Sequence, residues 1–325
     1  MRNFSSRALL FVYAAACVQP ASAQPAAGPY PVKPVVVVVA NVAGGTTDTE
    51  TRMYAQKLGE SLGKPFLIDY KPGAGGAIGA AFVAKAAPDG YTLLVASTSF
   101  PVVPALNDDL LYDPVKDFAP LSLMSKRPAV LLVHPDFPAR GLKEYLAYAR
   151  ANPRAINFGT SGSGGVQHLA GAWLHSASGT QVTFIHYKGA AAVIPDLLSG
   201  RLHAFPTALI TAMPHIRAGK LRAISILSME RSLLLPELKT ASEEAVEGFD
   251  MPSWVGLVAT GGTPTPIVNR LGNELAKIAK APDIAKKMEE GTLMVGSDPA
   301  QFARLIGTEV ARWRQLVKEH GIKQD

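Results

Sequence analysis

The sequence predicts an α/β protein of two lobes, and three features lead to that prediction. The first is the valine run Val35–Val39, which a glycine turn and a helix start follow directly. The second is the order strand, glycine loop, helix, which occurs twice before a third strand. The third is a second block, beginning at Ala129, in which strands, glycine loops and helices follow in a similar order. A run of β-branched residues before a turn is typical of a strand buried on both faces of a parallel sheet.

The first block contains three predicted strands, separated by two predicted helices. In chain order, the elements are strand Val35–Val39, a helix with Met53, Leu58 and Leu62 on one face, strand Phe66–Tyr70, loop Lys71–Gly79, helix Ala80–Ala87 and strand Tyr91–Ser97. This order predicts a parallel sheet with right-handed crossovers. The loops at the carboxyl ends of the strands then share one edge, where open α/β sheets bind ligands.

The second block repeats this order, and the chain then returns to the first lobe. Its predicted elements are strand Ala129–His134, helix Leu142–Ala151, strand Ile156–Thr160, strand Val182–Tyr187, a helix ending at Leu198 and strand Leu221–Leu227. The return is predicted from strand Trp254–Ala259, a helix through Leu271 and Leu275, and a last amphipathic helix through Phe302, Val310 and Trp313. We therefore expect one lobe from 24–124 and 229–325 and another from 125–228.

The amino terminus is typical of a secretory signal peptide. Arg2 and Arg7 precede an apolar run, Ala8–Val18, and Ala21–Ala23 follows the small-x-small pattern of a cleavage site. Removal of 1–23 would lower the formal net charge from +6 to +4. The basic residues are spread along the chain, so we expect a periplasmic protein without a nucleic-acid or membrane-binding surface.

The only cysteine, Cys17, lies inside this signal. Its context resembles a lipoprotein cleavage box without the usual leucine, so a lipid anchor is the alternative to cleavage after Ala23. After cleavage at Ala23, cysteine nucleophiles, thiolate metal sites and disulfides are excluded. The seven histidines are scattered and show no i, i+4 pair, and we predict no metal site.

Two glycine loops partly match enzyme motifs. Gly73, Gly75 and Gly79 lie between a strand and a helix, as in a dinucleotide-binding loop, but the acid expected about twenty residues later is missing. In the loop Gly159–Gly164, neither serine has glycine at both positions that a nucleophile elbow requires. We therefore predict no cofactor and a non-catalytic binding protein, with a secreted hydrolase or dehydrogenase as the alternative.

The loop after the valine run has the features of an anion-binding site. Gly44 and Gly45 allow a tight turn, and Thr46, Thr47 and Asp48 are all competent helix caps. The first N–H groups of a helix lack partners and attract negative charge. A well-made strand–helix turn without a ligand remains the simpler interpretation of this stretch.

Taken together, these loops and the signal resemble the Bug-type extracytoplasmic solute receptors of tripartite tricarboxylate transporters. The resemblance runs from about Tyr30 to the carboxyl terminus. It is carried by AGGTTD (Ala43–Asp48), KPGAGGAIGA (Lys71–Ala80), AAPDGYTLL (Ala86–Leu94), YDPVKDFAPLSL (Tyr112–Leu123), HLAG (His168–Gly171), YKG (Tyr187–Gly189), PHIRAGKLR (Pro214–Arg222) and Ser253–Trp254.

The resemblance implies a two-lobed periplasmic-binding-protein-like (type II) fold with a ligand cleft between the lobes. It implies a small carboxylate, amino acid or amide ligand, membrane permease subunits as partners, and we expect a monomer. Carried over by position, the predicted ligand-binding residues are Gly44, Gly45, Thr46, Thr47, Asp48, Ser97, Thr98, Ser99, Thr160, Ser161, Ser163, Gly164, His168 and Thr207.

The chain departs from the family pattern at several of these places. Ala40-Asn41-Val42 replaces a common Pro-aromatic-Pro, Pro206-Thr207 replaces a polar strand residue, and Gly165 and Val166 replace hydroxyls. Asn41 is therefore the candidate for ligand selectivity. Asp48 would repel a bound carboxylate, so it either caps its helix or receives an amide, an ammonium or a water-bridged group. A receptor that signals to a membrane sensor is a further alternative function.

Overall fold

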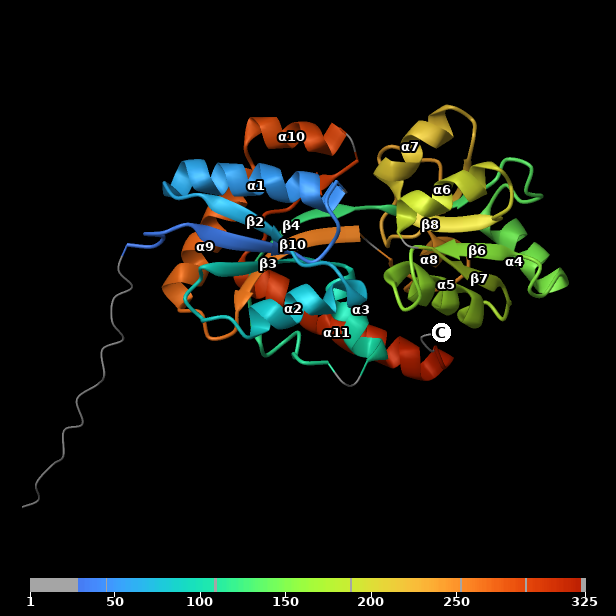
Figure 1. Ribbon diagram of the computed structural model, residues 1–325. Coiled ribbons are helices and arrows are strands. Elements are labelled where there is room, and N and C mark those ends of the chain that lie inside the picture. The colour runs from blue at the N-terminus through green and yellow to red at the C-terminus, as the bar shows by residue number, and fades with distance from the viewer. Residues whose placement is uncertain are drawn as a thin grey trace, which may run out of the picture.

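The computed structural model describes residues 29–44, 46–107, 110–187, 189–251, 253–289 and 291–322. The predicted signal peptide, its cleavage site and Cys17 lie outside these residues. Two lobes lie side by side in Figure 1, each built on one sheet with helices packed against it. Among the described residues, none of the helices is both long and apolar enough to cross a lipid bilayer.

The first lobe contains the sheet β11-β4-β10-β3-β1-β2. Its elements are β1 (Val35–Val39), α1 (Thr46–Leu62), β2 (Phe66–Tyr70), α2 (Ala77–Ala84), β3 (Thr92–Ser97), α3 (Ser99–Leu106), β4 (Phe118–Arg127), β10 (Ser253–Thr260), α9 (Thr265–Ala279), α10 (Pro282–Glu289), β11 (Leu293–Met294) and α11 (Pro299–His320). Strands β1, β2 and β3 are parallel, as predicted. Strands β4 and β10 are antiparallel additions, so the sheet is mixed.

The valine run shows why this sheet is buried on both faces. Val35, Val37 and Val39 belong to the core cluster that contains residues of α1 and α9. Val38 belongs to the opposite cluster, with residues of α2, α3 and α11. Because side chains alternate along a strand, five apolar residues in a row supply both cores at once.

The second lobe contains the sheet β7-β6-β8-β5-β9. Its elements are β5 (Ala129–Val133), α4 (Leu142–Ala151), β6 (Asn157–Thr160), α5 (Val166–Ala177), β7 (Thr183–His186), α6 (Ala190–Leu198), β8 (Ala204–Ala208), α7 (Leu209–Arg217), β9 (Arg222–Ile226) and α8 (Ala241–Glu244). Strand β6 is parallel to β7 and β8, whereas β5 is antiparallel to β8 and β9. The carboxyl ends of β6, β7 and β8 therefore share one edge.

Three parts of the chain connect the lobes. The chain leaves the first lobe where β4 ends at Arg127, and returns where β10 begins at Ser253. The long helix α11 packs its first half in the first lobe through Phe302 and Ile306. Its second half contributes Trp313 to the core cluster of the second lobe (Figure 1).

The residues that follow the predicted lobe boundary pack differently from the prediction. The predicted boundary at residue 228 assigns 229–251 to the first lobe. Ala241, Val246 and Phe249 nevertheless pack in the core cluster of the second lobe, and the ring of Phe249 stacks on Trp173 at 4.4 Å between centroids. Ala241, Val246 and Phe249, which precede β10, therefore pack with the second lobe.

Candidate functional site

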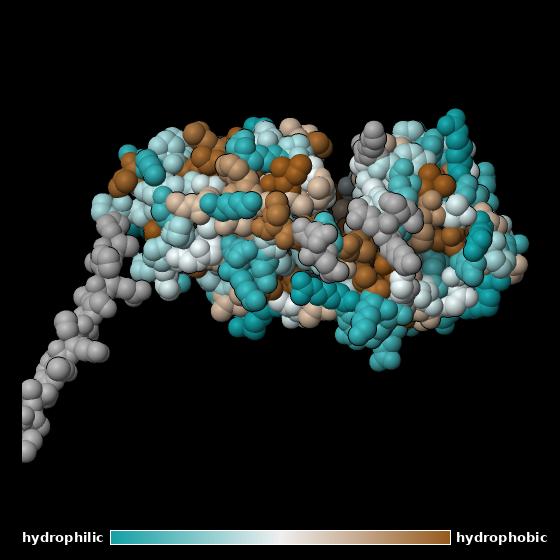
Figure 2. Space-filling view, turned by 60° about the horizontal axis from the view of Figure 1, so that its bottom comes forward, coloured by the Kyte–Doolittle hydropathy of each residue, from teal (hydrophilic) through white to brown (hydrophobic). Residues whose placement is uncertain are grey.

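The carboxyl ends of the parallel strands in both sheets point toward the space between the lobes (Figure 1). In the first lobe, this edge carries the loop after β1, the glycine loop after β2 and the start of α3. In the second lobe, it carries the loops after β6 and β7 and the start of α7. Figure 2 shows the crevice between the lobes from a second direction, with hydrophobic surface on both of its sides.

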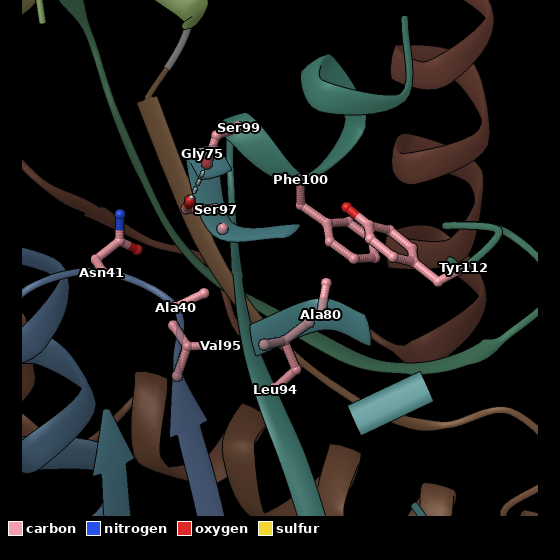
Figure 3. Close-up of a pocket in the computed structure, with 11 residues that line it drawn as sticks. Ala40, Asn41, Gly75, Ala80, Leu94, Val95, Ser97, Ser99, Phe100 and Tyr112 are labelled. Atoms are coloured by element: carbon pink, nitrogen blue, oxygen red, sulfur yellow. Dashed lines mark hydrogen bonds between the residues drawn. The ribbon is translucent and has the colours of Figure 1, made fainter. Parts of the chain in front are cut away.

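A pocket lies at this edge of the first lobe. Asn41, Ser97 and Ser99 line one side of it, and the rings of Phe100 and Tyr112 line the other (Figure 3). The remaining lining residues are Ala40, Gly75, Gly76, Ala80, Leu94 and Val95. In this structure the pocket has room for about one water molecule. A larger ligand would therefore lie mainly in the crevice, with one polar end at the pocket.

The polar groups of this pocket are neutral. The hydroxyls of Ser97 and Ser99 are 3.1 Å apart and hydrogen-bonded to each other, and both side chains are partly exposed. Asn41 is exposed at the rim and offers both a donor and an acceptor. None of the side chains that line the pocket carries a formal charge. An amide or a hydrogen-bonded carboxylate suits such a pocket better than a group that needs an opposite charge.

Asp48 is committed to its own loop. Its carboxylate accepts hydrogen bonds from the Gly44 N–H at 2.9 Å and from the Tyr70 hydroxyl at 2.5 Å, and it forms an ion pair with Arg52 at 3.2 Å. Burial opposes the charged form, but these hydrogen bonds outweigh it and hold the pKa of Asp48 below its usual value. Asp48 is only 5% exposed. These contacts tie the loop to β2 and to α1, and whether Asp48 also caps α1 or contacts the ligand stays a prediction.

The structure describes two other predicted residues of the first loop, Gly44 and Thr47, by their conformation and contacts. Gly44 adopts a positive φ of 91°, a conformation that glycine reaches without strain. Gly45 and the side chain of Thr46 lie outside the described residues. Thr47 is partly buried in the first turn of α1, and its carbonyl accepts a hydrogen bond from the Thr51 hydroxyl at 2.7 Å.

Thr98 differs from the serines on either side of it. Its hydroxyl accepts a hydrogen bond from the Trp254 N–H at 3.0 Å, and the residue is 6% exposed. This bond ties the end of β3 to the first residues of β10. The structure thus gives Thr98 a supporting contact, and ligand contact by Thr98 stays a prediction.

In the second lobe, the predicted residues gather in the loop between β6 and α5. Thr160 is fully buried, donates to the Gly162 carbonyl at 3.3 Å, and lies 2.6 Å from Nδ1 of His186. The Ser161 hydroxyl donates to Gln167 at 2.8 Å. Ser163 is partly exposed in the same loop. The loop is thus held by its own side chains, with α5 starting after Gly165 without a side-chain cap.

His168 contacts this loop through a hydrogen bond and packs on two neighbouring rings. Its Nδ1 accepts a hydrogen bond from the Gly164 N–H at 3.2 Å, and its ring packs edge-on against the rings of His186 and Phe184. His168 is 4% exposed. Thr207, 3% exposed in β8 beside Val130 of β5, is likewise buried at the edge of this site. Ligand contact by His168 and Thr207 stays a prediction.

Sequence reasoning missed part of the pocket. Gly75 and Gly76 line it, although the predicted ligand-binding residues include neither of them. Their position directly after β2 was the signal, because parallel neighbours end at the same edge as β1 and β3. Phe100 and Tyr112 carried no comparable signal, since their rings meet only after α3 has folded against the sheet.

The polar side chains that line the pocket are an amide and hydroxyls. Within the described ranges, no three or more His, Cys, Asp or Glu side chains are arranged to hold a metal ion. The hydroxyls at both strand edges bond to neighbouring side chains or main-chain groups, and they offer neutral hydrogen bonds.

Comparison with known proteins decides the family. Residues 51–322 match the model of the tripartite tricarboxylate transporter family receptor, called TctC. The chain belongs to this family. The relative BugT of Bordetella pertussis is 31% identical over 317 residues, which cover 97% of this chain and 96% of that protein. The expected resemblance to Bug-type receptors is thus confirmed, and the family is one of transport receptors, not enzymes.

Solved structures of TctC-type proteins share the fold. The periplasmic binding protein BugD is 32% identical with a TM-score of 0.79, covering 91% of this chain and 100% of that one. Rpa4515 of Rhodopseudomonas palustris, solved with adipate, is 32% identical with a TM-score of 0.81 over 90% and 99% of the two chains. MatC from the same species, solved with malate, is 32% identical with a TM-score of 0.79 over 89% and 100%. The chain has the two-lobed fold of these periplasmic binding proteins, as predicted.

Proposed function

We propose that this TctC receptor binds a small carboxylate, or a related amide, between its two lobes in the periplasm and delivers it to membrane permease subunits. The observation that supports this most is the neutral pocket of Asn41, Ser97 and Ser99 at the carboxyl edge of the first sheet, while the hydroxyl loop after β6 lies at the carboxyl edge of the second. The adipate and malate bound to two relatives fit the same chemistry. The signal peptide over residues 1–23 would direct the export, and the receptor acts as a monomer.

An elongated ligand suits two polar regions on opposite lobes. One polar end would lie at Ser97 and Ser99, and the other at the loop Ser161–Gly165. Each neutral hydrogen bond contributes roughly 1 kcal/mol net, and bonds to a charged group contribute more. Five or six such bonds with some buried area are enough for affinity on the order of micromolar.

Binding becomes transport only if the solute favours the closed form. A ligand that contacts both lobes binds more tightly when they approach, and this shifts the population toward closure. The permease subunits then recognise the closed shape. No bond of the solute is broken in this process.

A thermal-shift screen of dicarboxylates, monocarboxylates, amides and amino acids, followed by calorimetry, tests the proposal. We expect at least one carboxylate or amide to raise the melting temperature. Ser97→Ala and Ser99→Ala should each weaken that ligand about fivefold, since each removes about 1 kcal/mol. Ser199→Ala, which changes a serine at the end of α6, should leave the affinity unchanged. A screen without any stabilising acid, amide or amino acid would contradict the proposal.

A further inference from the structure

The first turns of α1 hold a buried carboxylate that does not line the pocket. Glu50 is 5% exposed and lies two residues after Asp48. Its Oε2 accepts a hydrogen bond from the Ser125 hydroxyl at 2.9 Å and forms an ion pair with the guanidinium of Arg127, which is 6% exposed. Ser125 and Arg127 both belong to β4, so this contact joins the helix of the ligand loop to that strand.

Arg127 occupies a particular place in the chain. It is the last residue of β4, and β5 of the second lobe begins only two residues later, at Ala129. It also pairs with Ser253, the first residue of β10, where the chain returns to the first lobe. Glu50 therefore holds the point at which the two crossing segments lie side by side.

A second contact holds the start of β10, next to Ser253. The Thr98 hydroxyl, between the two pocket serines, accepts the N–H of Trp254 at 3.0 Å. One crossing segment is thus tied to the helix after the first loop, and the other is tied to the end of β3. Both ties start within two residues of a predicted ligand-binding residue.

Stability alone is a weak reason for such a pair. Taking both charges out of water is costly, and apolar residues of similar size often stabilise a fold as well or better. Oε1 of Glu50 is buried and has no hydrogen-bond partner among the described residues, so the carboxylate is only partly compensated. What the pair supplies beyond packing is a fixed geometry between α1 and the end of β4.

We propose that Glu50 and Arg127 are positioning residues that couple the ligand loop, residues 41–48, to the hinge between the lobes. This inference rests on the proposed function. With the pair intact, the loop and the pivot of closure move as one body, so a solute held at the loop meets the second lobe in one orientation. Without the pair, the pivot loosens and fewer molecules occupy the arrangement that closes on the solute. Apparent affinity falls in proportion to that fraction.

The test separates stability from coupling. Glu50→Gln removes the charge but keeps the shape, and the double variant Glu50→Leu with Arg127→Met removes both charges. Asp283→Asn is the control, because it breaks the ion pair of Asp283 with Lys57 in α1 at 2.7 Å, away from the hinge. The measurements are the melting temperature, the affinity for malate or adipate, whichever stabilises the wild type more, and ligand-induced compaction by small-angle X-ray scattering.

We expect Glu50→Gln to lower both the melting temperature and the affinity. The double variant should regain the wild-type melting temperature, yet bind at least tenfold more weakly and compact less at saturating ligand. Asp283→Asn should bind and compact like the wild type. If the double variant regains affinity together with stability, the pair serves folding only and the inference is overturned. A wild type that binds neither malate nor adipate would overturn the coupling as well, and only a full screen without any ligand would overturn the proposed function.

Discussion

Asp48→Asn tests how far the first loop depends on one carboxylate. In the structure, this side chain accepts hydrogen bonds from the Gly44 N–H and the Tyr70 hydroxyl and pairs with Arg52. Hydrogen bonds to a charged group contribute roughly 1.5–3 kcal/mol each. Asparagine keeps one carbonyl oxygen, so it can still accept one of these bonds but carries no charge. We expect a loss of about 1.5–3 kcal/mol in the free energy that holds the loop in place.

This loss should appear mainly as weaker binding, because an unrestrained loop must be ordered again when the solute binds. A difference of 1.4 kcal/mol is tenfold in affinity, so we expect binding about 10- to 100-fold weaker by calorimetry at neutral pH. Asp136→Asn, in an exposed turn of the second lobe, is the control and should change nothing. Equal affinity of Asp48→Asn and wild type would refute the idea that this carboxylate organises the loop.

The pKa of Asp48 makes a related prediction about acid stability. The folded pKa lies below the usual value, so the stabilisation is complete above the ordinary carboxyl pKa and is lost as the pH falls through the folded pKa. The contribution of Asp48 should therefore be constant near neutral pH. It should disappear only in strongly acidic solution, where Asp48→Asn and wild type should converge in stability.

Three further predictions concern selectivity, packing and pH. Asn41→Asp should weaken the binding of carboxylate ligands at least tenfold by charge repulsion but leave the binding of neutral amides unchanged. Asn269→Asp, at an exposed position of α9, is the control and should change neither. Equal losses for acids and amides would contradict a role of Asn41 in selectivity. Gly79→Ala should lower the melting temperature by several degrees, because its Cβ would lie 2.9 Å from Cβ of Ala40, whereas Gly307→Ala, with no atom within 4 Å, should be neutral or stabilising. Burial lowers the pKa of His175 to about 3, so its neutral form stabilises the fold above about pH 6.5 and that stability is lost as the pH falls toward 3. His175→Gln should flatten this dependence in melting curves, and a wild-type melting temperature that is constant from pH 6.5 to 4 would contradict it.

The sequence was most informative where one element satisfied a strong local pattern. The valine run, the strand Phe66–Tyr70 and the helix Leu142–Ala151 appear with the predicted bounds. Each element is set by a continuous apolar run or by a helical period beside a clear turn. Neither of these two patterns depends on distant parts of the chain.

The sequence was least informative where distant contacts decide the structure. Strand β4 reads FAPLSLMSKR, without alternation or a flanking glycine, and it is a strand because β10 and β11 pair with it from the far end of the chain. Helix α3 contains Pro101 and Pro104, residues that argue against a helix when read locally. Phe100 of the pocket lies in α3, and Tyr112 lies between α3 and β4, so the aromatic wall was beyond prediction.

The candidate ligand residues divide in a similar way. Glycines and hydroxyls at strand ends predicted a site at the carboxyl edge of each sheet, and Asn41, Ser97 and Ser99 line one pocket at that edge of the first sheet. Which hydroxyls face the pocket depends on partners that come from other strands. Thr98, for example, is directed to Trp254, and Thr160 to His186.

A crystal structure of the protein with the acid or amide that stabilises it most would test the central claim directly. We expect one polar end of the solute beside Asn41, Ser97 and Ser99 and the other against the loop after β6, with the lobes closer together than in Figure 1. A solute held by one lobe alone, or bound outside the crevice, would contradict it.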